Sequence, residues 1–96
     1  MKAYVIIQVK VDNPELLKPY QEKAPLAIKK YNGKVLARGG EIATLEGKNS
    51  PDRVVVIEFP TLQEAKNFYF SEEYNEAKLL RENKAEFEII VTEGVS

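Results

Sequence analysis

Three charged residues set within apolar segments are the best candidates for chemistry in this sequence: Arg38, Arg53 and Glu58. A charged side chain in a strand is costly unless it is paired, so each of them predicts a specific partner. If residues 34–38 and 53–59 form neighbouring strands, Arg38 can reach Glu58 across the ladder. Gln8, on an adjacent strand, would lie on the same face. The pattern therefore predicts a polar island on an apolar face.

Two functions fit such an island. In the first, Arg38 holds a carboxylate or enolate through paired N–H donors, while Glu58 accepts a proton as a general base. In the second, Arg38 and Glu58 form a salt bridge that only fixes the register at a dimer interface. An open pocket beside a free Arg38 head group favours the first interpretation, and a closed ion pair without a cavity favours the second.

Tyr69 and Tyr74 are further candidates for ligand binding, because a phenol can donate a hydrogen bond to a ligand oxygen. The alternative is that both rings are core residues with their hydroxyls at the rim. Gly39 and Gly40 follow a strand without the spacing of a phosphate-binding loop, which favours a tight turn or bulge. Arg81 is expected at a solvated helix end, or as a partner for a carboxylate such as Glu73.

The composition excludes much of the usual catalytic chemistry. The 96 residues hold no Cys and no His, which excludes thiolate nucleophiles, disulfides, imidazole bases and Cys- or His-ligated metal. We therefore predict no metal and no cofactor. The net charge of −1 argues against nucleic acid as a partner. No apolar run is long enough for a membrane span or an export signal, so we expect a cytoplasmic protein without a membrane partner.

The elements that must position these residues alternate along a chain that we expect to form one domain, residues 1–96. Strands are predicted at 2–11, 34–38, 53–59 and 86–92, from β-branched and alternating apolar residues. Asn13 caps a helix that is interrupted by prolines and stops near residue 32, and Thr61 and Ser71 cap two more helical segments. Residues 41–52 are expected to form a hairpin-like excursion.

This order of elements is the split βαβ pattern of ferredoxin-like α+β folds, in which helices cover one face of an antiparallel sheet. The central strands are apolar on both faces, as Tyr4 and Ile6 alternate with Val5 and Ile7. Something must therefore cover the second face, and a second copy of the chain is the simplest cover. We predict that two sheets pack face to face as a dimeric α/β barrel.

Several motifs together resemble a known family. They are Ala-Arg-Gly-Gly at 37–40, Arg53 followed by Glu-Phe-Pro at 58–60, and Ser-x-x-Tyr at 71–74. With them, nearly the whole chain resembles the domain-of-unknown-function family numbered thirteen-thirty. That family is similar to the dimeric α/β-barrel superfamily, which also holds antibiotic-biosynthesis-type monooxygenases and muconolactone isomerases. The resemblance implies a homodimer.

We therefore expect a small-molecule-binding α/β-barrel homodimer with Arg38, Arg53, Glu58 and Tyr69 at its cavity. If it is an enzyme, the chemistry most compatible with these residues is cofactor-free proton transfer or oxygenation of an activated carbonyl compound. The alternative is a non-catalytic structural or stress-related dimer, in which the strand charges only pin the interface.

Overall fold

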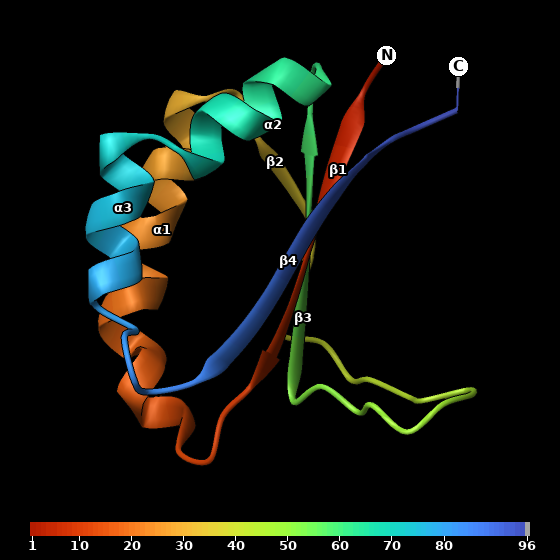
Figure 1. Ribbon diagram of the computed structural model, residues 1–96, viewed down its shortest axis with the longest axis vertical. Coiled ribbons are helices and arrows are strands. Elements are labelled where there is room, and N and C mark those ends of the chain that lie inside the picture. The colour runs from red at the N-terminus through yellow and green to blue at the C-terminus, as the bar shows by residue number, and fades with distance from the viewer. Residues whose placement is uncertain (96) are drawn as a thin grey trace.

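The computed structural model describes residues 1–95 and has two layers, a four-stranded antiparallel sheet and a layer of helices (Figure 1). The strands, in the spatial order β2-β3-β1-β4, are β1 (Ala3–Lys10), β2 (Lys34–Arg38), β3 (Arg53–Phe59) and β4 (Glu86–Glu93). The helical elements are the 3₁₀ turn η1 (Pro14–Leu17), α1 (Lys18–Lys30), α2 (Leu62–Tyr69) and α3 (Glu72–Leu79). All of them lie on one side of the sheet, which confirms the predicted α+β ferredoxin-like fold.

The helix starts follow from side-chain caps in the sequence. The side-chain oxygen of Asn13 accepts a hydrogen bond from the backbone N–H of Glu15, and those of Thr61 and Ser71 cap α2 and α3 in the same way. The predicted capping residues are confirmed. The carboxylate of Glu64, however, accepts from the Asn32 side chain at 3.2 Å, so it joins α2 to the turn after α1 instead of returning to the Thr61 amide.

The core lies between the sheet and the helices. Along β1 the odd-numbered side chains, from Ala3 to Val9, are at most 4% exposed because they face the helical layer. The largest fully buried side chains are Tyr74, Phe59, Phe68, Leu17, Ile57 and Val9. Aromatic rings link the two layers, since the Phe68 ring centroid lies 5.1 Å from Phe59 of β3 and 4.7 Å from Tyr74 of α3.

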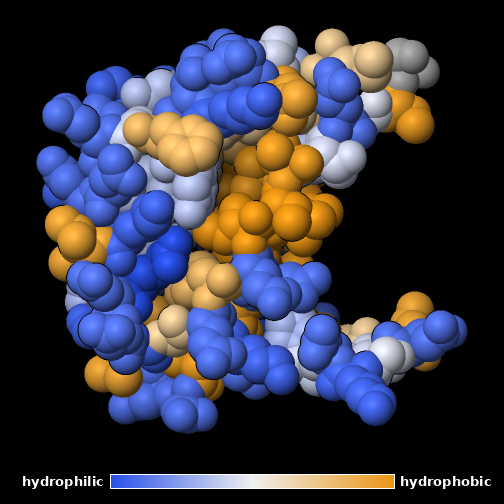
Figure 2. Space-filling model, in the orientation of Figure 1, coloured by the Kyte–Doolittle hydropathy of each residue, from blue (hydrophilic) through white to orange (hydrophobic). Residues whose placement is uncertain are grey.

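The other face of the sheet is not covered by any element of residues 1–95, and it carries an apolar patch. Ile6 of β1 lies opposite Val56 of β3 on one side and Ile90 of β4 on the other. Ile6 and Val56 are only partly buried, and Ile90 is 63% exposed. Figure 2 views the sheet from its β4 edge and shows apolar surface along that edge, below α2. We call Ile6, Val54, Val56 and Ile90 the open-face patch.

Residues 39–52 connect β2 to β3 and project away from the helices on the open side of the sheet (Figure 1). The excursion expected at 41–52 is present, and it contains no strand. Its hydroxyl groups at Thr44 and Ser50 lie 2.8 Å apart, and the Asp52 N–H donates to the Val9 carbonyl at its base. Leu45 at the outer part is 96% exposed, so this segment presents an apolar side chain outside the body of the protein.

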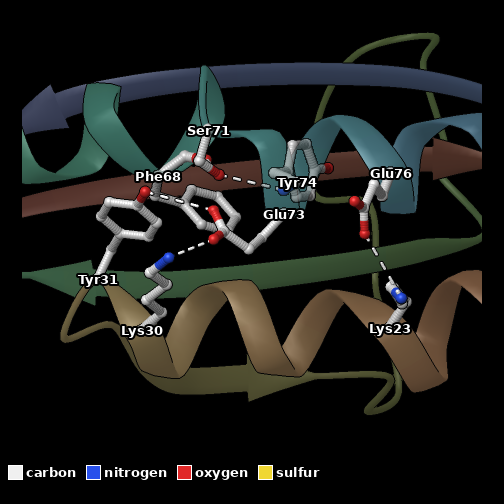
Figure 3. A network of polar contacts seen from close by, with 8 residues as sticks. All are labelled: Lys23, Lys30, Tyr31, Phe68, Ser71, Glu73, Tyr74 and Glu76. Atoms are coloured by element: carbon white, nitrogen blue, oxygen red, sulfur yellow. Dashed lines mark hydrogen bonds and ion pairs between the residues drawn. The ribbon is translucent and has the colours of Figure 1, made fainter.

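Two ion pairs join α1 to α3 on the surface of the helical layer (Figure 3). Lys30 bonds to Glu73, and the Lys23 ammonium lies 3.5 Å from a carboxylate oxygen of Glu76. The hydrogen bond from Lys30 lowers the pKa of the Glu73 carboxyl and in turn raises the pKa of the Lys30 ammonium. Tyr31 also donates to Glu73, at 3.4 Å.

The Lys30–Glu73 pair makes folding stability depend on pH. A carboxyl with a depressed pKa adds stability above its ordinary pKa of 4.5, and this is lost as the pH falls through the folded-state value. We expect Glu73→Gln to lower the melting temperature at pH 7 by a few degrees at most, and to have less effect at pH 2. Differential scanning fluorimetry from pH 2 to 8 would measure the difference in melting temperature between the two proteins. Glu22→Gln, on exposed α1 surface, is the control; an equal effect there would contradict the assignment.

Among the described residues, 1–95, no helix combines the length and the apolar character needed to cross a bilayer.

Candidate functional site

A cavity of about 430 Å³ lies between α1 and the helix-side face of the sheet. Most of its walls are apolar, and polar groups enter from the ends of β2 and β3 and from the middle of α1. The lining residues are Ile7, Val9, Leu17, Tyr20, Gln21, Ala24, Pro25, Ile28, Arg38, Arg53, Val55, Ile57, Phe68 and Phe87. This volume suits a small organic molecule.

Arg38 reaches this cavity because β2 contains a bulge. Lys34 lies opposite Glu58 and Val35 opposite Ile57, but the register then shifts, so that Ala37 lies opposite Val56. The extra residue reverses the alternation of the strand. Arg38 therefore lies opposite Val55, on the helix side, whereas regular pairing would place it opposite Val54, on the open face.

Arg53 is the first residue of β3, and its side chain reaches the cavity beside Gly39. It is paired with Val9 on the helix side of the sheet. Gly39 has a φ of +69°, and a Cβ atom built on it would lie 2.7 Å from an Arg53 guanidinium nitrogen. A side chain at position 39 would therefore be strained and would displace the guanidinium. Gly39 thus lets the chain turn after Arg38 while Arg53 packs against its backbone.

The two guanidinium groups have no ion-pair partner among residues 1–95. Among these described residues, no Asp or Glu lines the cavity. A guanidinium can bind a carboxylate through two parallel hydrogen bonds. The cavity thus combines apolar walls with two unneutralised cations, which is a suitable environment for an organic anion.

The α1 wall of the cavity contains a proline that lies inside the helix. Pro25 has no N–H, so it cannot donate the usual helical hydrogen bond to the carbonyl of Gln21. Both residues line the cavity. The Gln21 carbonyl therefore lacks the bond that residue 25 would otherwise donate, and Gln21 adds a polar residue to the cavity wall.

The predicted contact between Arg38 and Glu58 is wrong. Because of the bulge, Arg38 is on the helix side, whereas Glu58 lies on the open face, opposite Tyr4 and Lys34. The Tyr4 hydroxyl donates to Glu58 at 3.3 Å, and the Lys2 ammonium lies 3.6 Å from it. A base role for Glu58 stays a prediction, but its carboxylate does not line the cavity that holds the arginines.

The other predicted site residues also lie outside that cavity. Gln8 is on the open face, opposite Val54 and Glu88. Tyr74 is fully buried in the core, as the alternative interpretation expected. The Tyr69 hydroxyl accepts a hydrogen bond from Lys78 at 3.2 Å, and its ring lines a separate groove between α2 and β4. The structure therefore brings together Arg38 and Arg53 and leaves Gln8, Glu58, Tyr69 and Tyr74 elsewhere.

Two polar residues at or behind the cavity were not predicted as functional. Tyr20 follows the apolar helical spacing, which indicated only a core residue, yet its hydroxyl lies 2.6 Å from that of Tyr74. Arg81 is not a solvated helix end, because its guanidinium packs 3.8 Å from the centre of the Phe87 ring. Its expected partner Glu73 bonds to Lys30 instead. No local pattern in the sequence indicated these contacts, because the rings around Arg81 belong to three different elements, with Tyr20 on α1, Tyr74 on α3 and Phe87 on β4.

Solved structures of similar fold share little sequence with this chain. A protein of unknown function from Rhodopseudomonas palustris has a TM-score of 0.76 at 18% identity, covering 99% of this chain and 83% of its own. A dimeric ferredoxin-like protein of unknown function from Bacteroides fragilis has a TM-score of 0.67 at 16% identity, covering 97% and 96%. A putative antibiotic biosynthesis monooxygenase from Nitrosomonas europaea has a TM-score of 0.64 at 16% identity, covering 100% of both chains. These similarities establish the fold.

The sequence itself places the chain in a family. No curated protein matches it. The predicted resemblance to the family numbered thirteen-thirty is confirmed over almost the whole chain, including the Arg38 and Arg53 motifs. Residues 2–95 match the domain of unknown function DUF1330, and this protein is a member of that family.

Proposed function

We propose that this protein binds a small organic molecule with a carboxylate or similar anionic group in the cavity between α1 and the sheet. The anion is held by Arg38 and Arg53, and the apolar part of the ligand packs against α1 and β3. The observation that carries the proposal is the pair of guanidinium groups without ion-pair partners, among residues 1–95, at a largely apolar cavity of about 430 Å³.

The alternative, a closed salt bridge that only pins an interface, is less well supported. It needs Arg38 to be paired with Glu58, but the two residues lie on opposite faces of the sheet. An open cavity beside Arg38 is the arrangement expected of a binding protein. The lack of a carboxylate on the cavity wall, within residues 1–95, makes binding better supported than proton abstraction by this chain.

Octanoate is a suitable probe for this site, since it joins a carboxylate to a flexible apolar chain. In isothermal titration calorimetry we expect it to bind the wild-type protein, and octanamide, its neutral analogue, to bind less tightly. Arg38→Gln and Arg53→Gln should each weaken octanoate binding about 10- to 100-fold, because a charge-assisted hydrogen bond contributes about 1.5–3 kcal/mol.

The matched control is Lys34→Gln, which removes a cation from the same strand as Arg38 but on the open face. It should leave the affinity for octanoate unchanged. Equal affinity in the wild type and both arginine variants, or equal weakening by Lys34→Gln, would contradict a site built on Arg38 and Arg53.

We also propose that two copies of the chain pack through their open-face patches. The patch is apolar along three neighbouring strands, and burial of apolar surface drives association. The solved proteins of similar fold from Bacteroides fragilis and Thermobifida fusca are described as dimeric. Residues 39–52 project on the same side, so we expect Leu45 to contact the partner copy. Sedimentation equilibrium should give twice the chain mass of 10.9 kDa; a single-chain mass at tens of micromolar would contradict this.

A further inference from the structure

The hydroxyl groups of Tyr20 and Tyr74 form a close pair behind the cavity, with their oxygens 2.6 Å apart. Tyr20 extends from α1 and lines the cavity, whereas Tyr74 extends from α3, is fully buried and does not line it. Burial raises the pKa of the Tyr20 phenol well above its ordinary value of 10.0, so the group keeps its proton. The pair therefore holds two phenolic hydrogens.

Only one of these hydrogens is used between the two oxygens. The other needs an acceptor, since a buried donor without one is costly. Arg81 lies beside the pair: its Nη2 is 3.5 Å from the Tyr74 oxygen, and its guanidinium carbon is 5.3 Å from the centre of the Tyr20 ring. A guanidinium has donors and no acceptor, so Arg81 can donate to a phenol oxygen but cannot accept its hydrogen.

The surroundings of the two rings indicate which of the two hydroxyl hydrogens is left without an acceptor in the pair. Tyr74 is 0% exposed, and its ring is packed against Phe68 and Tyr69. Its hydroxyl is best satisfied by accepting from Arg81 and donating to Tyr20. This leaves the hydrogen of Tyr20 on the one ring of the pair that borders the cavity.

We propose that Tyr20 is a second polar contact for the ligand and donates its phenolic hydrogen to an uncharged oxygen of that molecule. The proposal rests on the anion-binding function above and narrows its ligand class. Because the Tyr20 hydrogen needs an acceptor, the ligand carries a carbonyl or ether oxygen in addition to its carboxylate. An oxo acid with an apolar chain is the simplest compound that satisfies Arg38, Arg53 and Tyr20 together.

The test compares octanoate with the set of straight-chain mono-oxo-octanoates, which are isomers of one another, by isothermal titration calorimetry. We expect at least one isomer to bind the wild-type protein about 5- to 10-fold more tightly than octanoate, as one added hydrogen bond predicts. In Tyr20→Phe this preference should disappear, so that octanoate and the oxo acids bind with equal affinity. Tyr31→Phe is the matched control, because it also removes a phenol hydroxyl near α1, one that bonds to Glu73 outside the cavity.

The outcomes separate this inference from the proposed function. If octanoate binds and depends on Arg38, but no oxo isomer binds more tightly, the role of Tyr20 is overturned and the anion site stands. A preference that persists in Tyr20→Phe also overturns it. If neither octanoate nor any isomer binds, both proposals fall. Circular dichroism and thermal melting of each variant would establish that a lost preference does not come from unfolding.

Discussion

Replacing Val56 with aspartate is expected to convert the proposed dimer into folded monomers. Val56 belongs to the open-face patch and lies opposite Ile6 of β1 and Ala37 of β2. In a face-to-face dimer the variant buries one carboxylate per chain without a partner, which costs several kcal/mol per ion. The dissociation constant should rise at least about 100-fold, since each factor of ten corresponds to about 1.4 kcal/mol.

Sedimentation velocity over a range of protein concentrations would measure this change. Asn67→Asp is the matched control, because it adds the same carboxylate to an exposed position of α2 in the helical layer. It should leave the wild-type mass unchanged. A Val56→Asp protein that keeps its native circular dichroism spectrum and still sediments as a dimer would show that the open faces do not form the interface.

Truncating Tyr74 to alanine is expected to give the largest loss of folding stability. The side chain is 0% exposed, and its ring lies against those of Phe68, Tyr69 and Tyr20. Deleting a buried aromatic ring removes its apolar contacts and leaves a cavity, at a cost of about 3–5 kcal/mol. This is a large part of the about 5–15 kcal/mol that stabilises a typical domain.

Urea unfolding at one fixed protein concentration, followed by circular dichroism, would measure the loss. Tyr74→Phe separates the ring from the hydroxyl, because it keeps the packing and removes only the hydrogen bonds to Tyr20 and Arg81. We expect this milder change to cost about 1–2 kcal/mol. If Tyr74→Ala lost no more than Tyr74→Phe, the aromatic cluster would not be the centre of the core.

The fold could be predicted because the signals that specify it are local. Asn13, Thr61 and Ser71 accept hydrogen bonds from backbone groups two or three residues along the chain, so each cap is visible in a few neighbouring residues. Alternation in β1 and β3 likewise assigns side chains to faces without knowledge of the partner strand. Val54, Val56 and Glu58 share a face of β3 because they alternate with Val55 and Ile57.

The candidate site was predicted only in part, because its arginines were identified but their neighbours were not. Arg38 and Arg53 lie beside Tyr20, Gln21 and Pro25, which come from a helix in a different part of the chain. The polar role of Tyr20 depends on Tyr74, 54 residues away in the sequence. No spacing along the chain encodes such a contact, since it arises from the packing of α1 against α3.

The sequence by itself determined the order of elements, their caps, the two apolar faces of the sheet and the presence of isolated strand charges. Only the tertiary structure decided which charges share a site. A single bulge between Val35 and Ala37 turns Arg38 from the face of Glu58 to the face of Arg53. The side-chain period of a strand is two residues, so one extra residue reverses the face of every position after it. That choice depends on the pairing of β2 with β3, and the residues of β2 alone do not contain it.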